Sequence, residues 1–238
     1  MHMRRLLCAL AACAATVSLS GCTMVNHLLH PPITDTDDTP ATENTSTVVG
    51  GASRSIPQAW LDAAAEGWPS SEAYSKPYDP ITSYSDANGT CLLDGDLPTP
   101  FGTTPRSFGT GWGSLDTDKE GYRYSCEYYA PGRYATSLVL MAGNADAVGE
   151  AITTVKNTTS DSVQDNSVET VEIGDVSYLV LTTWFPTNPQ GKYLVLFHDE
   201  AADAIVAYDL NSLKKADFEE LGAEGAAQLL DDFLASAQ

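Results

Sequence analysis

The first residues of this chain determine the compartment in which it folds. Arg4 and Arg5 precede an apolar run from Leu6 to Val17, and small residues follow it. A cationic start, an apolar core of about a dozen residues and small residues before a cut are the three parts of an export signal. The run is too short for a transmembrane helix, which needs roughly 20 apolar residues. The sequence therefore predicts a cleavable signal peptide over residues 1–21 and a mature chain that folds outside the cytoplasm.

The signal ends in the tetrapeptide Leu19-Ser20-Gly21-Cys22. It resembles the bacterial lipobox, in which the cysteine sulfur is joined to diacylglycerol and the chain is cut just before that cysteine. The resemblance implies a lipoprotein of the diacylglycerol and palmitate type, anchored through Cys22 on the extracytoplasmic face of the cell membrane. Two acyl chains anchor stably, since each buried methylene contributes about 0.8 kcal/mol. The alternative is an ordinary secretory signal in which Cys22 has no role.

The five cysteines divide into three groups. Cys8 and Cys13 leave with the signal, Cys22 takes the lipid, and Cys91 and Cys126 remain. In an exported chain an even remainder predicts a disulfide, and the two positions lack the close CxxC spacing of zinc or redox sites. Closing this loop of about 36 residues stabilises the fold by roughly 4 kcal/mol if the gain is treated as chain entropy.

Charge narrows the range of partners. The chain has 238 residues and a net charge of -20, and two of its twelve basic residues lie in the signal, which leaves the mature chain near -22. Binding of phosphates requires Lys and Arg, so we expect neither a nucleic-acid partner nor direct binding to anionic lipid. The membrane contact is then the lipid on Cys22.

Composition also divides the chain into segments. Residues 22–55 are rich in Thr, Asp and Pro and have few core residues, which predicts a disordered tether after the lipidated N-terminus. Residues 56–238 are expected to form a single globular domain.

Hydrophobic periodicity gives the elements of that domain. A short helix is expected from Ile56 to Glu66, followed by a loop-like stretch from Pro69 to Arg106. Period-two alternation and a turn at Gly132 predict a hairpin. The expected strands are 122–128, 134–141, 168–173, 177–185, 192–198 and 204–208, and the expected later helices are 144–156, with Asn144 as N-cap, and 223–235. Short connections favour antiparallel pairing, so we predict an α+β fold with a mainly antiparallel sheet of about five strands, two or three packed helices and one disulfide.

Four short segments carry a family resemblance: Cys91-Leu92-Leu93, Cys126-Glu127-Tyr128, Ile173-Gly174-Asp175 and the last helix. With the signal, lipobox and tether, they resemble the actinobacterial cell-envelope lipoproteins of unknown function that carry a paired-cysteine domain. The resemblance spans residues 91–237 and implies no established activity.

Catalytic motifs are sparse. Ser212 and Lys215 have SxxK spacing, but no SDN or KTG accompanies them, so we expect a helix-capping serine and solvated lysines. His198 has no GxSxG partner, and the glycines from Gly109 to Gly113 do not fit GxGxxG and are expected in a loop. The acidic turns at 94–96 and 199–203 lack EF-hand spacing. We therefore expect no catalytic residues, no metal site and no cofactor.

Aromatic residues are the remaining candidates for a site. Rings offer flat apolar area with a polar edge, and could form a platform for a sugar or a peptide. The candidates are Trp112, Tyr122, Tyr124, Tyr128, Tyr129 and Tyr134. The alternative is a strand face packed beneath a helix, with Tyr129 exposed because it breaks the alternation.

These patterns favour a non-enzymatic binding module whose partner is a protein, a glycan or a small ligand. Two alternatives remain open: a hydrolase acting on cell-envelope polymers, and a structural or assembly factor of an envelope complex. A pocket with perturbed carboxylates would favour the enzyme, and an exposed aromatic face would favour binding.

The intact mass of protein isolated from membranes tests the anchor and the disulfide together. We expect a mass that lacks residues 1–21 and includes a diacylglyceryl group at Cys22, with two thiols that become alkylated only after reduction. An unlipidated mass, or two free thiols in the native protein, would contradict the lipoprotein hypothesis.

Overall fold

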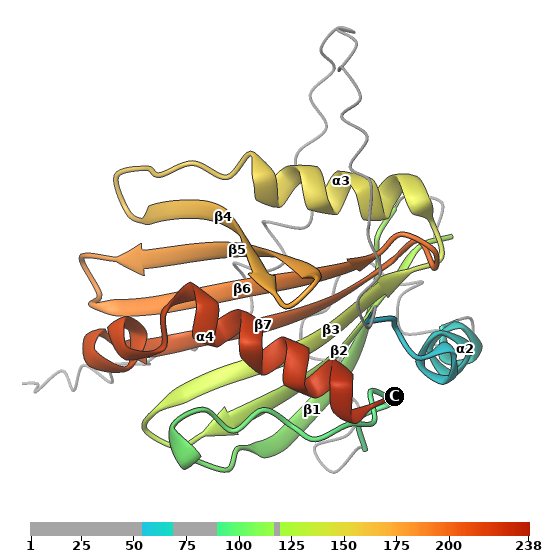
Figure 1. The fold of residues 1–238 in the computed structure, drawn as a ribbon, viewed down its shortest axis with the longest axis horizontal. Helices are drawn as coiled ribbons and strands as arrows, with labels where there is room; N and C mark the ends of the chain where they lie inside the picture. Colours follow the sequence, from blue (N-terminus) through green and yellow to red (C-terminus); the bar gives the residue numbers. More distant parts are fainter. Residues whose placement is uncertain (1–53, 69–89, 117–119) are drawn as a thin grey trace, which may run out of the picture.

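A computed structural model describes residues 54–68, 90–116 and 120–238 (Figure 1). The signal peptide, Cys22 and the tether up to residue 53 lie outside the described residues, so the expectations for them stay predictions. Among the helices of the described segments, none combines the length and the apolar character needed to cross a membrane.

The core of the domain is an antiparallel sheet, for which the described residues supply seven strands in the order β1-β2-β3-β7-β6-β5-β4. Two meanders, β1 to β3 and β4 to β7, meet where β3 pairs with β7. The strands are β1 (Arg106–Ser114), β2 (Tyr122–Ala130), β3 (Tyr134–Ala142), β4 (Asp165–Ile173), β5 (Val176–Phe185), β6 (Gln190–Asp199) and β7 (Ala204–Lys214). The helices of the same residues are α2 (Gln58–Gly67), α3 (Ala145–Lys156) and α4 (Lys215–Ser236), with a short 3-10 turn, η2 (Pro100–Gly102).

The helices cover both faces of the sheet. Helix α3 connects β3 to β4 and packs Val148, Ala151 and Val155 onto one face. Helices α2 and α4 pack on the other face, and Figure 1 shows α4 lying across the strands. Side chains alternate between these two cores along each central strand, as period-two geometry requires. The α+β class and the disulfide are as predicted, and the three helices of the described residues agree with the predicted two or three.

The structure confirms several local features that the sequence predicts. The predicted hairpin joins β2 to β3, and Gly132 in its turn has a φ of 72°. Asn144 is the N-cap of α3, where its side-chain oxygen accepts a hydrogen bond from Ala147 N at 3.2 Å. This bond satisfies one of the backbone N–H groups that a helix leaves unpaired at its start.

The expected number of about five strands is wrong. The segment from Gly109 to Gly113, expected in a loop, belongs to strand β1, which pairs with β2 along nearly its full length. Glycine lowers local strand propensity, but hydrogen bonds to a long neighbouring strand outweigh it. Gly111 is buried beside Ser125, whose hydroxyl bonds the Gly111 carbonyl at 3.5 Å. The glycines of this edge strand have low strand propensity, and for that reason the sequence did not predict it.

The predicted last helix is confirmed, and a further helical segment precedes it. Helix α4 begins at Lys215, and Gly222, with a φ of 65°, divides it into two parts, the second of which matches the predicted helix. Ser212 is not its cap, since it lies in β7 with a φ of 63° and bonds the Asn211 side chain. Lys215 contacts Glu219 one helical turn away, at 3.6 Å.

Gly191 offers a test of this packing. A β-carbon there would clash with the ring of Phe218, which itself stacks on Tyr193 at a centroid distance of 4.7 Å. We expect Gly191→Ala to lower the free energy of unfolding by about 1–3 kcal/mol, because overpacking forces neighbours apart. Chemical denaturation would measure the change.

Gly149 is the matched control. It lies within α3 with nothing near its missing β-carbon, so Gly149→Ala should raise the free energy of unfolding by up to about 1 kcal/mol. Equal effects at the two glycines would contradict the packing described for Phe218.

Candidate functional site

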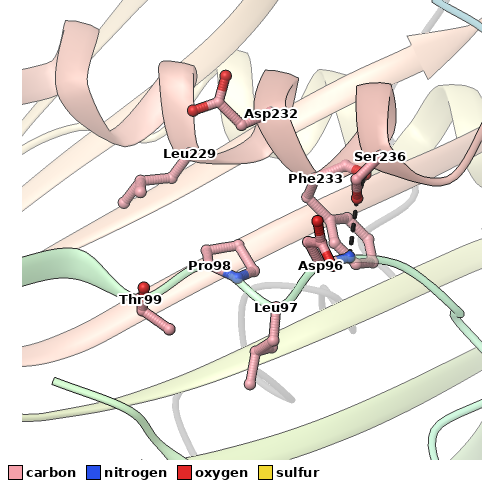
Figure 2. Close-up of a pocket in the computed structure, with 8 residues that line it drawn as sticks. All are labelled: Asp96, Leu97, Pro98, Thr99, Leu229, Asp232, Phe233 and Ser236. Atoms are coloured by element: carbon pink, nitrogen blue, oxygen red, sulfur yellow. Dashed lines mark hydrogen bonds between the residues drawn. The ribbon is translucent and has the colours of Figure 1, made fainter. Parts of the chain in front are cut away.

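A cleft of about 260 Å³ lies between the loop at residues 96–99 and the last turns of α4 (Figure 2). We call it the loop–helix cleft. It is lined by Asp96, Leu97, Pro98, Thr99, Leu229, Asp232, Phe233 and Ser236.

Helical spacing places one wall of the cleft. Leu229, Asp232, Phe233 and Ser236 follow the i, i+3, i+4, i+7 pattern and so share one face of α4. Phe233 forms the floor, because its ring is 1% exposed and stacks on Trp60 at 5.3 Å.

The loop forms the opposite wall by close approach to α4. A β-carbon at Gly95 would lie 2.8 Å from the Phe233 ring, so only glycine fits at this approach. Asp96 N then donates a hydrogen bond to Ser236 Oγ at 2.8 Å, as Figure 2 shows. The loop is thus held against the helix by packing and by one hydrogen bond.

The cleft combines apolar walls with negative charge. Leu97 and Leu229 are half-buried, whereas Asp96 and Asp232 are exposed. Asp232 accepts a hydrogen bond from Gln228 Nε2 at 2.8 Å, one turn back along the helix. Such a surface suits a ligand with an apolar stem and a cationic end.

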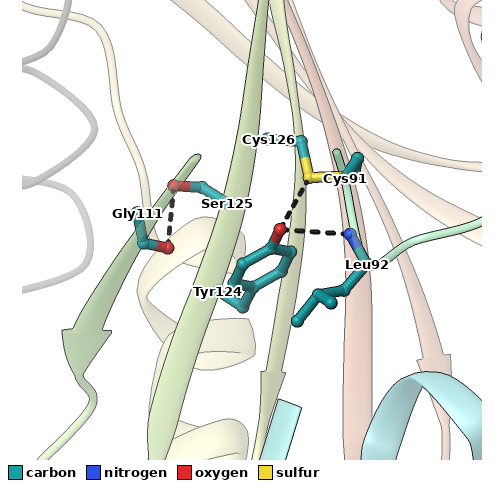
Figure 3. Close-up of a disulfide and its surroundings, with 6 residues drawn as sticks. All are labelled: Cys91, Leu92, Gly111, Tyr124, Ser125 and Cys126. Carbon is teal, nitrogen blue, oxygen red and sulfur yellow. Dashed lines mark hydrogen bonds between the residues drawn. A yellow bond between two sulfur atoms is a disulfide. The ribbon is translucent and has the colours of Figure 1, made fainter. Parts of the chain in front are cut away.

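The predicted disulfide is confirmed, and it ties the segment that leads into the cleft to the sheet (Figure 3). Cys91 and Cys126 have their Cα atoms 5.7 Å apart. The Tyr124 hydroxyl lies 3.4 Å from Cys126 Sγ, and accepts a hydrogen bond from Leu92 N at 3.1 Å. The covalent bond and the tyrosine together fix the chain just before the cleft.

The structure places most of the candidate aromatic residues in the core. Tyr122, Tyr124, Tyr128 and Tyr134 are between 1% and 7% exposed, on the face covered by α2 and α4. Burial raises the pKa of Tyr128 and of Tyr134 to about 12. These four rings pack beneath the helices and offer no open platform for a ligand.

The other two aromatic residues differ from these four. Trp112 on β1 is half-buried and lies 6.4 Å from Trp68 and 4.7 Å from Tyr124, measured between ring centroids. Tyr129 is 48% exposed, as its position outside the alternation predicts. The six residues therefore do not form one surface.

A second network lies beside the cleft, at Asp231. Arg54 donates two hydrogen bonds to its carboxylate, both 2.9 Å, and Tyr178 donates a third at 2.6 Å. Ser55 accepts a bond from Gln238 at 3.2 Å. Residues 54 and 55, which the sequence assigns to the tether, thus already contact α4 and the C-terminus.

These hydrogen bonds determine the protonation of Asp231. Burial raises the pKa of the carboxyl, but the hydrogen bonds from Arg54 and Tyr178 favour the ionised form and bring the pKa below its ordinary value. Burial, and then the bond to Asp231, raise the pKa of Tyr178. At neutral pH the Asp231 carboxylate is therefore ionised, and it accepts two hydrogen bonds from the Arg54 guanidinium and one from the Tyr178 hydroxyl.

The remaining motifs have ordinary surroundings in the structure. His198 lies at the end of β6, opposite Ile205. Asp199 accepts hydrogen bonds from Ala201 N and Ala202 N within a turn, and a third from Ile56 N, which is distant in sequence. Across residues 54–68, 90–116 and 120–238, no three His, Cys, Asp or Glu side chains are grouped as metal ligands would be.

Sequence reasoning missed the cleft residues and a buried ion pair between Lys192 and Asp209. Asp96 and Asp232 gave no signal, because acidic surface residues are common in so acidic a chain. Asp209 did give one: it interrupts the apolar run from Ala204 to Leu210 and must be buried if that run is a central strand.

Comparisons with protein-family models, with curated proteins and with solved structures found no match to this chain.

The network at Asp231 predicts a specific pH dependence. Because the carboxyl pKa is depressed by folding, its stabilising effect is complete above the ordinary carboxyl pKa and is lost as pH falls through the folded-state value. We expect Asp231→Asn to lower the free energy of unfolding by about 1–3 kcal/mol at neutral pH. The difference from the wild type should narrow in acid, as denaturation at several pH values would show.

Asp232→Asn is the control for this prediction. Asp232 is exposed and bonds only to Gln228 among the contacts described, so its loss should change stability by less than about 0.5 kcal/mol. If the free energies of unfolding of the wild type and of Asp231→Asn differed by the same amount at every pH, the ionised state described for Asp231 would be contradicted.

Proposed function

We propose that this chain is an extracytoplasmic lipoprotein, held at the cell membrane by a lipid on Cys22, whose domain is a non-enzymatic binding module. The Cys91–Cys126 disulfide supports this compartment, because structural disulfides form and persist in exported proteins. The ion pair of Arg54 with Asp231 supports the tethered arrangement, since it fixes the point where the segment after Cys22 joins the domain.

The loop–helix cleft is the observation that carries the binding role. Its volume of about 260 Å³ is below the roughly 300–1,000 Å³ typical of pockets for drug-sized ligands. It suits a single basic side chain of a partner protein, whose alkyl stem would pack on Leu97 and Leu229 while its charge reaches Asp96 or Asp232. The net charge of -20 would attract such a partner and speed the encounter.

Binding of a short oligo-arginine peptide tests this proposal. We expect Asp96→Asn combined with Asp232→Asn to weaken binding roughly two- to fivefold, because one or two exposed ion pairs are lost and each contributes about 0.5 kcal/mol. Fluorescence anisotropy of a labelled peptide at low and moderate salt would measure the change.

A second double variant controls for net charge. Glu150→Gln with Glu200→Gln removes the same charge from exposed positions on α3 and after β6, away from the cleft. This variant should bind the peptide nearly as the wild type does. Equal weakening in both double variants would mean that binding follows overall charge, and the cleft would lose its role.

A further inference from the structure

Lys192 and Asp209 form a buried pair on neighbouring central strands. Lys192 Nζ on β6 lies 3.0 Å from Asp209 Oδ2 on β7, and the two side chains are only 9% and 1% exposed. Both residues lie on the face of the sheet that α3 covers in part, since they alternate with residues of the opposite core.

The pair lacks the support that a buried ion pair needs. Neither oxygen of Asp209 makes a hydrogen bond, and the ammonium approaches Oδ2 by distance but not in a hydrogen-bonding direction. Burying two charges is expensive unless hydrogen bonds satisfy the remaining polar atoms. Asp231, by contrast, accepts three hydrogen bonds, so the two buried carboxylates differ in the donors that surround them.

The backbone beside the pair is bulged. Gly191 pairs with Leu213 and Tyr193 with Leu210, so Lys192 stands opposite two residues of β7 instead of one. Ser212, one of these two, has a φ of 63°, which is uncommon for a residue with a side chain. Bulges of this kind turn a side chain out of regular register and are frequent beside reactive sites.

We propose that Lys192 and Asp209 join in an intramolecular isopeptide bond. Transfer of a proton from the ammonium to the carboxylate gives an amine and a carboxylic acid, neither of which carries charge into the interior. The amine attacks Asp209 Cγ, and a proton passes from the nitrogen to the departing hydroxyl. A C–N bond forms, a C–O bond breaks and one water leaves, with no change of oxidation state.

The position of the pair favours this step. Reacting groups held about 3–3.5 Å apart gain the advantage of a unimolecular reaction, and a buried site does not readmit the released water. The product is an amide that crosses between β6 and β7, in the middle of the sheet. A cross-link there would hold the hairpin closed in a protein that is exposed to proteases outside the cell.

Trypsin digestion of the full-length, reduced and denatured protein tests the proposal. Trypsin cannot cut after an acylated lysine, and residues 157–214 contain no other cleavage site before Lys214. We expect one peptide spanning 157–214 that is lighter than its sequence by one water. Complete cleavage into 157–192 and 193–214, with both masses unchanged, would overturn the bond.

Two variants localise the chemistry, each checked for folding by circular dichroism. Lys192→Arg should restore the lost water to the intact mass, after correction for the substitution, whereas Lys156→Arg on the exposed end of α3 should leave it missing.

Discussion

The pairing of β3 with β7 is the interaction on which the rest of the structure depends. It joins the two meanders, which in the described residues share no other ladder. This single ladder supplies the centre of both cores: Leu138, Leu140, Val206 and Tyr208 on one face, and Val139, Met141, Ile205 and Ala207 on the other. A slip of one residue would exchange the two faces, so the positions of all the helices depend on this register.

On the face that carries the loop–helix cleft, covalent and ionic ties complement apolar packing. The disulfide holds the loop before the cleft, and Arg54 holds the start of the domain against α4. The disulfide and the ion pair each hold a chain segment with little regular structure against the rest of the domain. The cleft exists because the loop approaches α4 at Gly95, where no side chain separates them.

Two buried carboxylates show how surroundings decide chemistry. Asp231 accepts three hydrogen bonds and has a depressed pKa, as a structural anion does. The carboxylate of Asp209 is more deeply buried, accepts no hydrogen bond and lies 3.0 Å from Lys192 Nζ, beside a bulged backbone. Residue type is the same in both cases, so the difference comes from which donors the fold brings to each carboxylate.

The sequence by itself determined the elements whose signals are local: the alternation of β2, the Asn144 cap of α3, the apolar stripe of α4 and the even pair of cysteines. It did not reveal β1, whose glycines lack strand propensity and are ordered only by pairing with β2. It also could not separate core tyrosines from a binding surface, because alternation says which rings share a face and not what covers that face. Only the tertiary structure decided the loop–helix cleft, the Arg54–Asp231 ion pair and the Lys192–Asp209 pair. Each brings together residues that become neighbours only when the sheet and the helices have assembled.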